Sequence, residues 1–262
     1  MCKLFDVSRS GYYRFARISH EPEKDAWLAE QIRQCQEQSK GTYGYRRVWK
    51  WLDKRGIHKN PKTVLRVMKK YGLLSQVRRK RKWKQMGQQM HKYNNLLNRE
   101  FSAQHPNRKW VTDISYIHTK QGVLYLSMIR DLYDNSIVAY KTSGSQTVSL
   151  VLDTIKLAMK KEKITENLQL HSDQGFQYTS SAYHNLTTQY GITPSMSRRG
   201  NCYDNAMAEN FFSILKSECI YRKKPDTFHE AKRRIDEYIH FYNHERIQLK
   251  TGEAPLTLRF SS

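Results

Sequence analysis

The sequence predicts a small all-α module followed by a larger α/β domain, and three observations support this fold class. Residues 24–72 contain three short amphipathic stretches separated by glycines, which is typical of helices joined by tight turns. Residues 109–142 contain three runs rich in aromatic and β-branched residues, which predict strands. From residue 147 onward, helical and strand patterns alternate, as they do where helices cover a sheet.

The first module is predicted to be a helix-turn-helix-like bundle. Its helices cover 24–38, 45–55 and 60–72, and an Asn-Pro pair opens the third helix as an N-cap and a first-turn proline. Before it, residues 1–23 form a short segment with room for one helical turn. The apolar faces comprise Leu28, Ile32 and Cys35, bordered by Trp27, then Tyr45, Val48, Trp49 and Leu52, and finally Val64, Val67, Met68 and Tyr71.

Positive charge is concentrated in the first part of the chain. Of the net charge of +22, residues 1–110 hold 27 basic and 8 acidic residues, whereas residues 111–262 hold 19 and 16. This asymmetry favours a bound polyanion over a merely solubilising surface, and no dense apolar helix face points to a membrane. We therefore expect nucleic-acid contacts from the third helix, and leave sequence-specific readout open. The candidate residues are Lys62, Arg66, Lys69 and Lys70.

A basic linker is predicted at 78–105. It begins with six basic residues and one tryptophan in seven positions, followed by a polar, aperiodic stretch. We expect it to become ordered on nucleic acid, with a flexible charged tether as the alternative. Its candidate contact residues are Arg78, Arg79, Lys80, Arg81 and Lys82.

Targeting and redox signals are weak. No run of about 18 apolar residues is present, and the N-terminus lacks the apolar core of a secretory signal. The four cysteines are scattered without a Cys-x-x-Cys pair, which disfavours a disulfide framework or a zinc knuckle. The expected compartment is a reducing cytoplasm.

The larger domain is predicted to begin with an antiparallel meander and to continue with alternating helices and strands. Strands are expected from Lys109, at 123–130 and at 136–142, then at 168–172 and 192–195. Helices are expected at 147–161, 180–190, 204–220 and 228–243, and an irregular tail with Pro255 follows.

Three acidic residues in distinctive local runs are the candidate catalytic and metal-binding site. Asp113 lies in the first strand, Asp173 at the carboxyl end of the fourth, and Glu209 on a helix, with 59 and 35 residues between them. Three converging carboxylates can hold two divalent ions, which stabilise the attacking and the leaving oxygen in phosphoryl transfer. Asp113 lies in an apolar run, where an unpaired charge is costly, although hydrogen bonds alone would also satisfy it.

Four other polar residues near this site are candidates to contact DNA. Asn205 and Lys216 share a helix face with Glu209 and are candidates to contact DNA phosphates. Arg198 and Arg199 belong to a basic loop, 197–201, and are further candidates.

Several polar residues are expected to have no catalytic role. We expect Asp204 and Glu218 at the surface and His171 to be an ordinary strand histidine rather than a partner of a metal ligand. His240 and His244 have a zinc-compatible spacing but no evident third ligand.

Six runs of the chain are distinctive: G-T-Y-G-Y-R-R-V (41–48), N-P-K-T-V-L-R-V-M (60–68), W-V-T-D-I-S-Y-I (110–117), H-S-D-Q-G-F-Q-Y-T-S (171–180), S-R-R-G-N-C-Y-D-N-A-M-A-E-N-F-F-S-I-L-K-S-E (197–218) and F-Y-N-H-E-R (241–246). These runs resemble those of bacterial insertion-sequence DDE transposases, specifically the second-reading-frame (OrfB) product with a retroviral-integrase-type catalytic core. Asn210 stands where the family usually has serine, and Lys216 follows Glu209 by seven residues as the family's basic residue does.

The resemblance implies an RNase H-like core at 106–225, which is a five-stranded mixed sheet flanked by helices. A helix-turn-helix-like domain at 24–77 precedes this core, and a C-terminal helix and tail at 226–262 follow it. It implies Asp113, Asp173 and Glu209 as ligands of two Mg²⁺ or Mn²⁺ ions. The implied reaction is cleavage at the element's terminal repeats, followed by attack of the 3′-OH on target DNA.

The implied partners are the upstream-frame product, as a fusion, and further copies of the chain on DNA. An RNase H-like nuclease and a non-catalytic DNA-binding regulator of transposition are the alternatives. The implied location is the bacterial cytoplasm, at the nucleoid.

Overall fold

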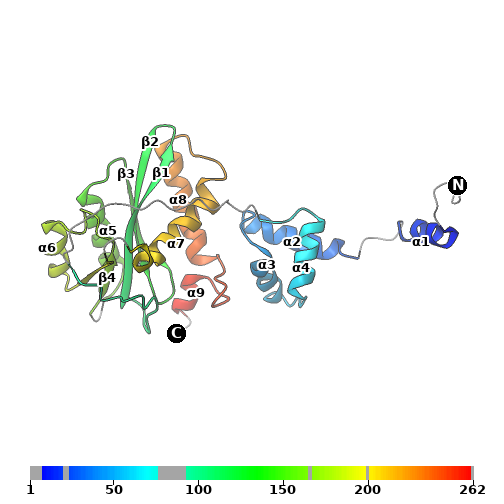
Figure 1. Cartoon of the computed structure of the whole chain (residues 1–262), viewed down its shortest axis with the longest axis horizontal. Helices are drawn as coiled ribbons and strands as arrows, with labels where there is room; N and C mark the ends of the chain where they lie inside the picture. Colours follow the sequence, from blue (N-terminus) through cyan, green and yellow to red (C-terminus); the bar gives the residue numbers. More distant parts are fainter. Residues whose placement is uncertain (1–7, 20–23, 76–92, 165–166, 199–200, 261–262) are drawn as a thin grey trace. The chain divides into compact units, whose positions relative to one another are not determined.

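The chain forms two compact units, Met1–Gln76 and Val77–Ser262, and each is considered by itself (Figure 1). The computed structural model describes residues 8–19, 24–75, 93–164, 167–198 and 201–260. The predicted contacts Arg78, Arg79, Lys80, Arg81, Lys82 and Arg199 lie outside these residues. Among the helices that the described residues form, none is both long and apolar enough to cross a membrane.

The first unit contains the three predicted helices, α2 (Ala26–Gln38), α3 (Tyr45–Asp53) and α4 (Pro61–Lys70), preceded by α1 (Arg9–Ser19). Asn60 caps α4, because its side chain accepts a hydrogen bond from the Lys62 N–H at 2.8 Å. Gly56 and Gly72, with φ of +74° and +68°, follow α3 and α4 in the left-handed conformation that glycine adopts most easily. The helix-turn-helix-like bundle is therefore confirmed.

One core assignment in α3 was wrong. Trp51 is buried with Val48 and Leu52, whereas Trp49 is only partly buried. The Trp51 indole donates to Gln38 Oε1, and the guanidinium of Arg55 lies 3.5 Å from the centre of its ring. Trp51 lies at i+3 from Val48, so helical spacing was compatible with its burial, and these contacts accommodate its polar edge and its face.

The second unit is built on a five-stranded mixed sheet with the order β3-β2-β1-β4-β5. The strands are β1 (Lys109–Thr119), β2 (Gly122–Asp131), β3 (Ile137–Ser143), β4 (Gln169–Ser172) and β5 (Thr193–Met196). The first three form the predicted antiparallel meander, and β4 and β5 run parallel to β1. The predicted sheet is confirmed.

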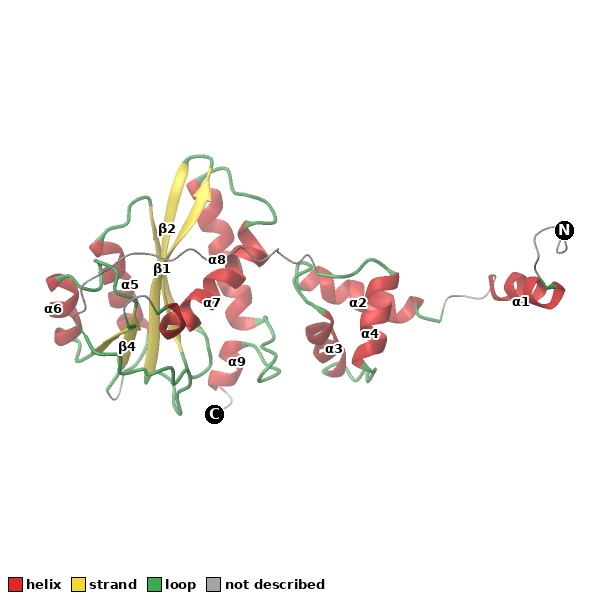
Figure 2. Ribbon diagram, viewed as in Figure 1, coloured by secondary structure: helices red, strands yellow, loops and turns green. Residues whose placement is uncertain are grey.

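Helices cover both faces of the sheet (Figure 2). One face carries α5 (Val148–Lys161) and α6 (Ser181–Gln189), and the other carries α7 (Ala206–Leu215) and α8 (Phe228–His244). Trp110 and Ile114 of β1 join the core beneath α5. Side chains alternate between the faces of a strand, so Asp113 and Ser115 project to the α7 side.

The predicted helix 204–220 is three successive segments. A 3₁₀ turn (Cys202–Asn205) precedes α7, and a π-helical turn (Lys216–Ile220) follows it. The Tyr221 N–H donates to the Lys216 carbonyl at 2.8 Å, which is the i→i+5 bond of a π turn. The sequence pattern did not predict these changes of helix type, because it was interpreted with the α-helical rotation of about 100° per residue.

The tail is more regular than predicted. Residues 255–260 form α9 (Pro255–Phe260), and a proline suits the first turn of a helix. Arg259 of α9 reaches three acids of the core, with its Nη1 2.8 Å from Glu162. The other two are Asp131 and Asp134. This buried ion-pair cluster holds the tail on the sheet unit, and a local sequence pattern carries no sign of it.

Candidate active site

The pairing of β1 with β4 places two of the three acids at the same level. Val111 pairs with His171 in the parallel register, and Asp113 and Asp173 each follow two residues later. Neighbouring strands lie about 4.8 Å apart. Two acids with 59 residues between them thus meet where the carboxyl end of β4 lies beside the middle of β1, and open α/β sheets bind ligands at the carboxyl ends of their parallel strands.

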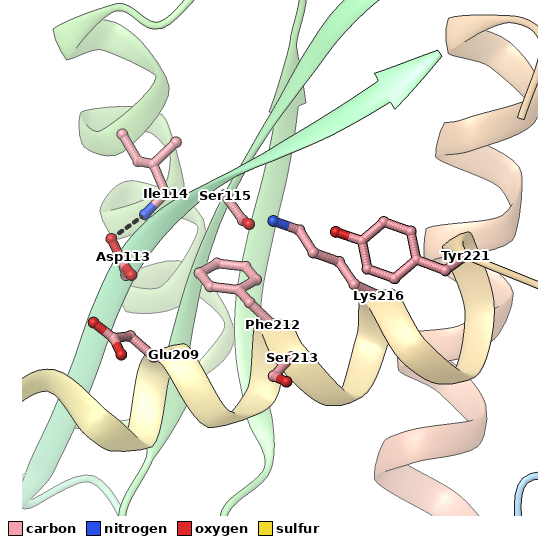
Figure 3. Close-up of a pocket in the computed structure, with 8 residues that line it drawn as sticks. All are labelled: Asp113, Ile114, Ser115, Glu209, Phe212, Ser213, Lys216 and Tyr221. Atoms are coloured by element: carbon pink, nitrogen blue, oxygen red, sulfur yellow. Dashed lines mark hydrogen bonds between the residues drawn. The ribbon is translucent and has the colours of Figure 1, made fainter. Parts of the chain in front are cut away.

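Glu209 approaches from α7, which packs against β1. Figure 3 shows its carboxylate turned toward that of Asp113. Both line an open pocket of about 310 Å³. The other lining residues are Ile114, Ser115, Phe212, Ser213, Lys216 and Tyr221.

The electrostatics of the three acids show that they affect one another. Burial, followed by the Asp173 charge, raises the pKa of Asp113 well above its usual range, and Glu209 adds to the shift while Lys216 opposes it. Burial also raises the pKa of Asp173. Burial and then the Asp173 charge raise the pKa of Glu209. The site therefore concentrates negative charge that a bound cation would stabilise.

Backbone N–H groups already hold two of the carboxylates. Ile114 donates to Asp113 Oδ1 at 2.7 Å, and Gly175 donates to Asp173 Oδ1 at 2.9 Å. A Cβ atom at Gly175 would lie 2.9 Å from Asp173 Oδ1, so a larger residue there would displace the carboxylate. As the side chains stand, no three His, Cys, Asp or Glu residues of the described ranges form a group ready to hold a metal ion.

Lys216 lies beside the acids, and its contact with DNA stays a prediction. It lines the pocket with Glu209, and its charge lowers the pKa of Asp113. Asn205 does not face the pocket: it is buried at the start of α7, and its Oδ1 makes no hydrogen bond among the described residues. The helical spacing assumed for Asn205 failed because the chain there is a 3₁₀ turn.

Asp204 was wrongly expected at the surface. Its carboxylate is fully buried and accepts hydrogen bonds from Asn95 Nδ2 and Arg99 Nε, both at 2.9 Å. Arg198 donates to it from the backbone and the guanidinium. The predicted DNA contact Arg198 is thus committed to Asp204, with half of its side chain still exposed.

Glu218 was also wrongly expected at the surface. Its side chain accepts from Arg246 Nη2 at 2.6 Å and Nε at 2.8 Å, and from the Tyr238 hydroxyl at 2.7 Å. Arg246 is itself buried. The pair joins the π turn to α8 and the segment after it, and the partners are 28 residues apart, beyond any local pattern.

His171 behaves as an ordinary buried histidine. Its Nδ1 lies 2.9 Å from Ser195 Oγ, which accepts the N–H groups of Leu96 and Leu97. The single hydroxyl hydrogen therefore points to Nδ1, and the imidazole is neutral. Burial lowers the pKa of His171 to about 4, which agrees with this arrangement.

The zinc-compatible histidine pair remains a surface feature. His240 and His244 stack with ring centres 4.5 Å apart on the exposed side of α8. Within the described part of the chain, no group of three possible ligands includes them.

The predicted contacts on α4 lie in the first unit. Lys62, Lys69 and Lys70 are exposed, and the Lys70 Nζ lies 5.3 Å from the centre of the Tyr71 ring. Arg66 forms a two-point ion pair with Asp25, at 2.7 and 2.9 Å. The role of these four residues in DNA binding stays a prediction.

Comparisons with known proteins agree with this architecture. An "HTH-like domain" family matches residues 22–81, and "Integrase core domain" families match residues 103–202 and 209–261. The "Putative transposase InsK for insertion sequence element IS150" of Escherichia coli (strain K12) is 38% identical over 260 residues, covering 99% of this chain and 92% of that protein. The chain belongs to the insertion-sequence transposases. A second transposase relative, for insertion sequence element IS904 of Lactococcus lactis, is 39% identical over 223 residues, covering 84% of this chain and 88% of that protein.

A solved structure shares the fold of this transposase. The cryo-EM structure of the simian T-cell lymphotropic virus intasome in complex with PP2A regulatory subunit B56 gamma contains a chain that is 16% identical, with a TM-score of 0.53. The match covers 78% of this chain and 68% of the other. At this sequence identity the match supports an integrase-like fold and says nothing about the roles of individual residues.

Two pocket residues of the transposase, and one arginine outside the pocket, were not foreseen as functional. Ser115 and Tyr221 line the pocket but had no assigned role, and Arg99 helps to hold Asp204. For Ser115 the signal was available, because it lies two residues after Asp113 on the same strand face. For Tyr221 none was, since its direction depends on the π turn.

Proposed function

We propose that this transposase cleaves DNA at the ends of its element and joins the freed 3′-OH to a target phosphodiester. The observation that supports this most directly is the meeting of Asp113, Asp173 and Glu209, each with a raised pKa, beside a pocket that also contains Lys216. A nuclease that only hydrolyses would use the same acids, so joining is the step that distinguishes the two.

The donor set of the site fits two Mg²⁺ or Mn²⁺ ions, because it consists of carboxylate oxygens that raise one another's pKa even with the charge of Lys216 nearby. Asp113, Asp173 and Glu209 would hold the ions; backbone N–H groups occupy Oδ1 of Asp113 and of Asp173, and neither of these bonds uses Oδ2. When bound, the ions supply activation of the attacking oxygen and stabilisation of the leaving oxygen.

The protein's own groups position the DNA. The ammonium of Lys216 would hold a phosphate oxygen at the edge of the pocket, opposite the acids. The N–H of Gly175 and the absence of a side chain there keep Asp173 in reach of the site. The exposed lysines of α4 would add sequence-independent phosphate contacts.

The assembly is part of the same proposal. We expect a homo-oligomer on paired element ends, acting with the upstream-frame product as a fusion, in the bacterial cytoplasm where chromosomal DNA lies. Sedimentation of the chain with and without end DNA tests the oligomer, since a species that remains monomeric on DNA would contradict it.

The decisive experiment compares Asp173→Asn with the wild type. The chain is incubated with Mg²⁺ and a pre-cut element end, and ligated products are separated on a denaturing gel. We expect joining by the wild type, loss of joining in Asp173→Asn, and equal DNA affinity for both. Asp153→Asn on the exposed side of α5 is the matched control. Nicking without joining would support the nuclease, and joining by Asp173→Asn would refute the assignment of that residue.

A further inference from the structure

The π turn after α7 changes which residues face the pocket. In a regular α-helix, residues five positions apart point about 140° away from each other around the axis. In the π turn the Tyr221 N–H bonds to the Lys216 carbonyl, which returns position i+5 to roughly the direction of position i. Lys216 and Tyr221 consequently line the same pocket.

Buried contacts on the opposite side maintain this turn. Glu218 points away from the pocket into the two-point ion pair with Arg246 and the hydrogen bond from Tyr238. Ile220 is buried as well, at 2% exposure. Because Glu218 and Ile220 are anchored, Tyr221 is directed outward, and about half of its surface is exposed.

The pocket has two chemically different ends. Figure 3 shows the polar tips of Ser115, Lys216 and Tyr221 turned toward one another at one end, with the carboxylates of Asp113 and Glu209 at the other. The ring of Phe212 lies between the two ends. One ammonium and two hydroxyl groups offer hydrogen-bond donors without a carboxylate among them, which suits a phosphate.

We propose that Ser115, Lys216 and Tyr221 form a second phosphate subsite, in which the Tyr221 hydroxyl donates to a non-bridging oxygen of the phosphodiester next to the reacting one. This inference rests on the proposed function for the identity of the ligand as DNA. The subsite sets the position of the strand along the pocket, so that the reacting phosphate lies at the carboxylate end. Tyr221 is therefore a DNA-binding residue and takes no part in proton transfer.

The test measures binding separately from chemistry. The affinity of the full chain for a pre-cut element end is measured by fluorescence anisotropy in Ca²⁺, for the wild type and Tyr221→Phe. We expect Tyr221→Phe to bind about five- to tenfold more weakly, as expected for one lost hydrogen bond. Tyr190→Phe is the matched control, because Tyr190 is an exposed tyrosine that does not line the pocket. Equal affinity of Tyr221→Phe and the wild type would overturn the proposal.

Replacing single phosphates by uncharged methylphosphonates shows which phosphate Tyr221 contacts. A series of end and target duplexes carries one methylphosphonate each. In the wild type, one position adjoining the reacting phosphate should weaken binding, and at that position Tyr221→Phe should show no further loss. A sensitive position in the end duplex identifies the element strand as the ligand, and one in the target duplex identifies the target strand. If both losses add at every position, Tyr221 does not contact a phosphate, and the proposal is refuted.

The two proposals fail in different ways. If the wild type joins no strands but its loss of affinity at one methylphosphonate position depends on Tyr221, the subsite is supported and the joining function is refuted. If the wild type joins strands normally and Tyr221→Phe equals it in binding and joining, the function stands and the subsite is refuted.

Discussion

Asp204→Asn tests how the loop before α7 is held. The buried carboxylate of Asp204 accepts hydrogen bonds from Asn95, Arg99 and Arg198, at distances from 2.9 to 3.1 Å. Asparagine preserves the shape, but it removes the charge and turns an amide N–H₂ group toward donors. Since Asp204 lies five residues before Glu209, the substitution should loosen the start of the helix that carries this acid.

The size of the effect follows from the burial of the acid and the exposure of its partners. A hydrogen bond to a charged group contributes about 1.5–3 kcal/mol, and breaking a fully buried ion pair costs about 3–5 kcal/mol. The side chains of Arg99 and Arg198 are 48% and 54% exposed, so water can replace part of the hydrogen bonding that the two arginines lose when the carboxylate is removed. We therefore expect a loss of about 2–3 kcal/mol, which lowers Tm by about 4–12 °C for a domain of this size.

The assay is hydrogen exchange of peptides covering residues 195–215, measured across a urea series so that the second unit is followed by itself. The bond from Arg198 holds the pKa of Asp204 well below its usual range. A carboxylate with a lowered folded pKa contributes stability above its unfolded pKa of about 4 and loses it as the pH falls below that value. The difference in the free energy of unfolding between the wild type and Asp204→Asn should thus have its full size at pH 7 and be smaller at pH 3.

The control for this prediction is Asp153→Asn, an exposed acid on α5 that should change stability by less than about 0.5 kcal/mol. A difference of that small size for Asp204→Asn at pH 7, or one that does not shrink at pH 3, would refute the reasoning.

Three further predictions concern other parts of the chain. Gly175→Ala should reduce strand joining at least tenfold, because its Cβ would lie 2.9 Å from Asp173 Oδ1; unchanged joining would contradict that crowding. Lys62→Ala and Lys69→Ala should each reduce the slope of log affinity against log salt concentration by about 0.9, and a slope equal to wild type would remove that lysine from the DNA contacts. Burial raises the pKa of Cys35 to about 12, so a thiol reagent at pH 8 should label it after urea treatment and leave it unlabelled in the native chain, as peptide mass spectrometry would show.

The sequence by itself determined the elements and the identity of the candidate acids. Strand periodicity around Asp113 and the run that ends in Asp173 were sufficient to place the first acid within a strand and the second directly after one, because side-chain alternation and turn residues are local properties. The Asn60 cap and the glycines at helix ends were readable for the same reason. The family resemblance then indicated a five-stranded mixed sheet, whereas the strand order β3-β2-β1-β4-β5 comes from the tertiary structure.

Tertiary structure alone decided which polar residues are buried and which way the chain turns after α7. Asp204 meets Arg99 across 105 residues, and Glu218 meets Arg246 across 28, so neither burial leaves a periodic trace in the sequence. Those contacts exist because packing brings distant charges together, and the energy of a buried pair depends on that meeting. Tyr221 reaches the pocket through a single wide turn that packing against α8 stabilises, whereas the α-helical spacing assumed from sequence would have pointed it elsewhere.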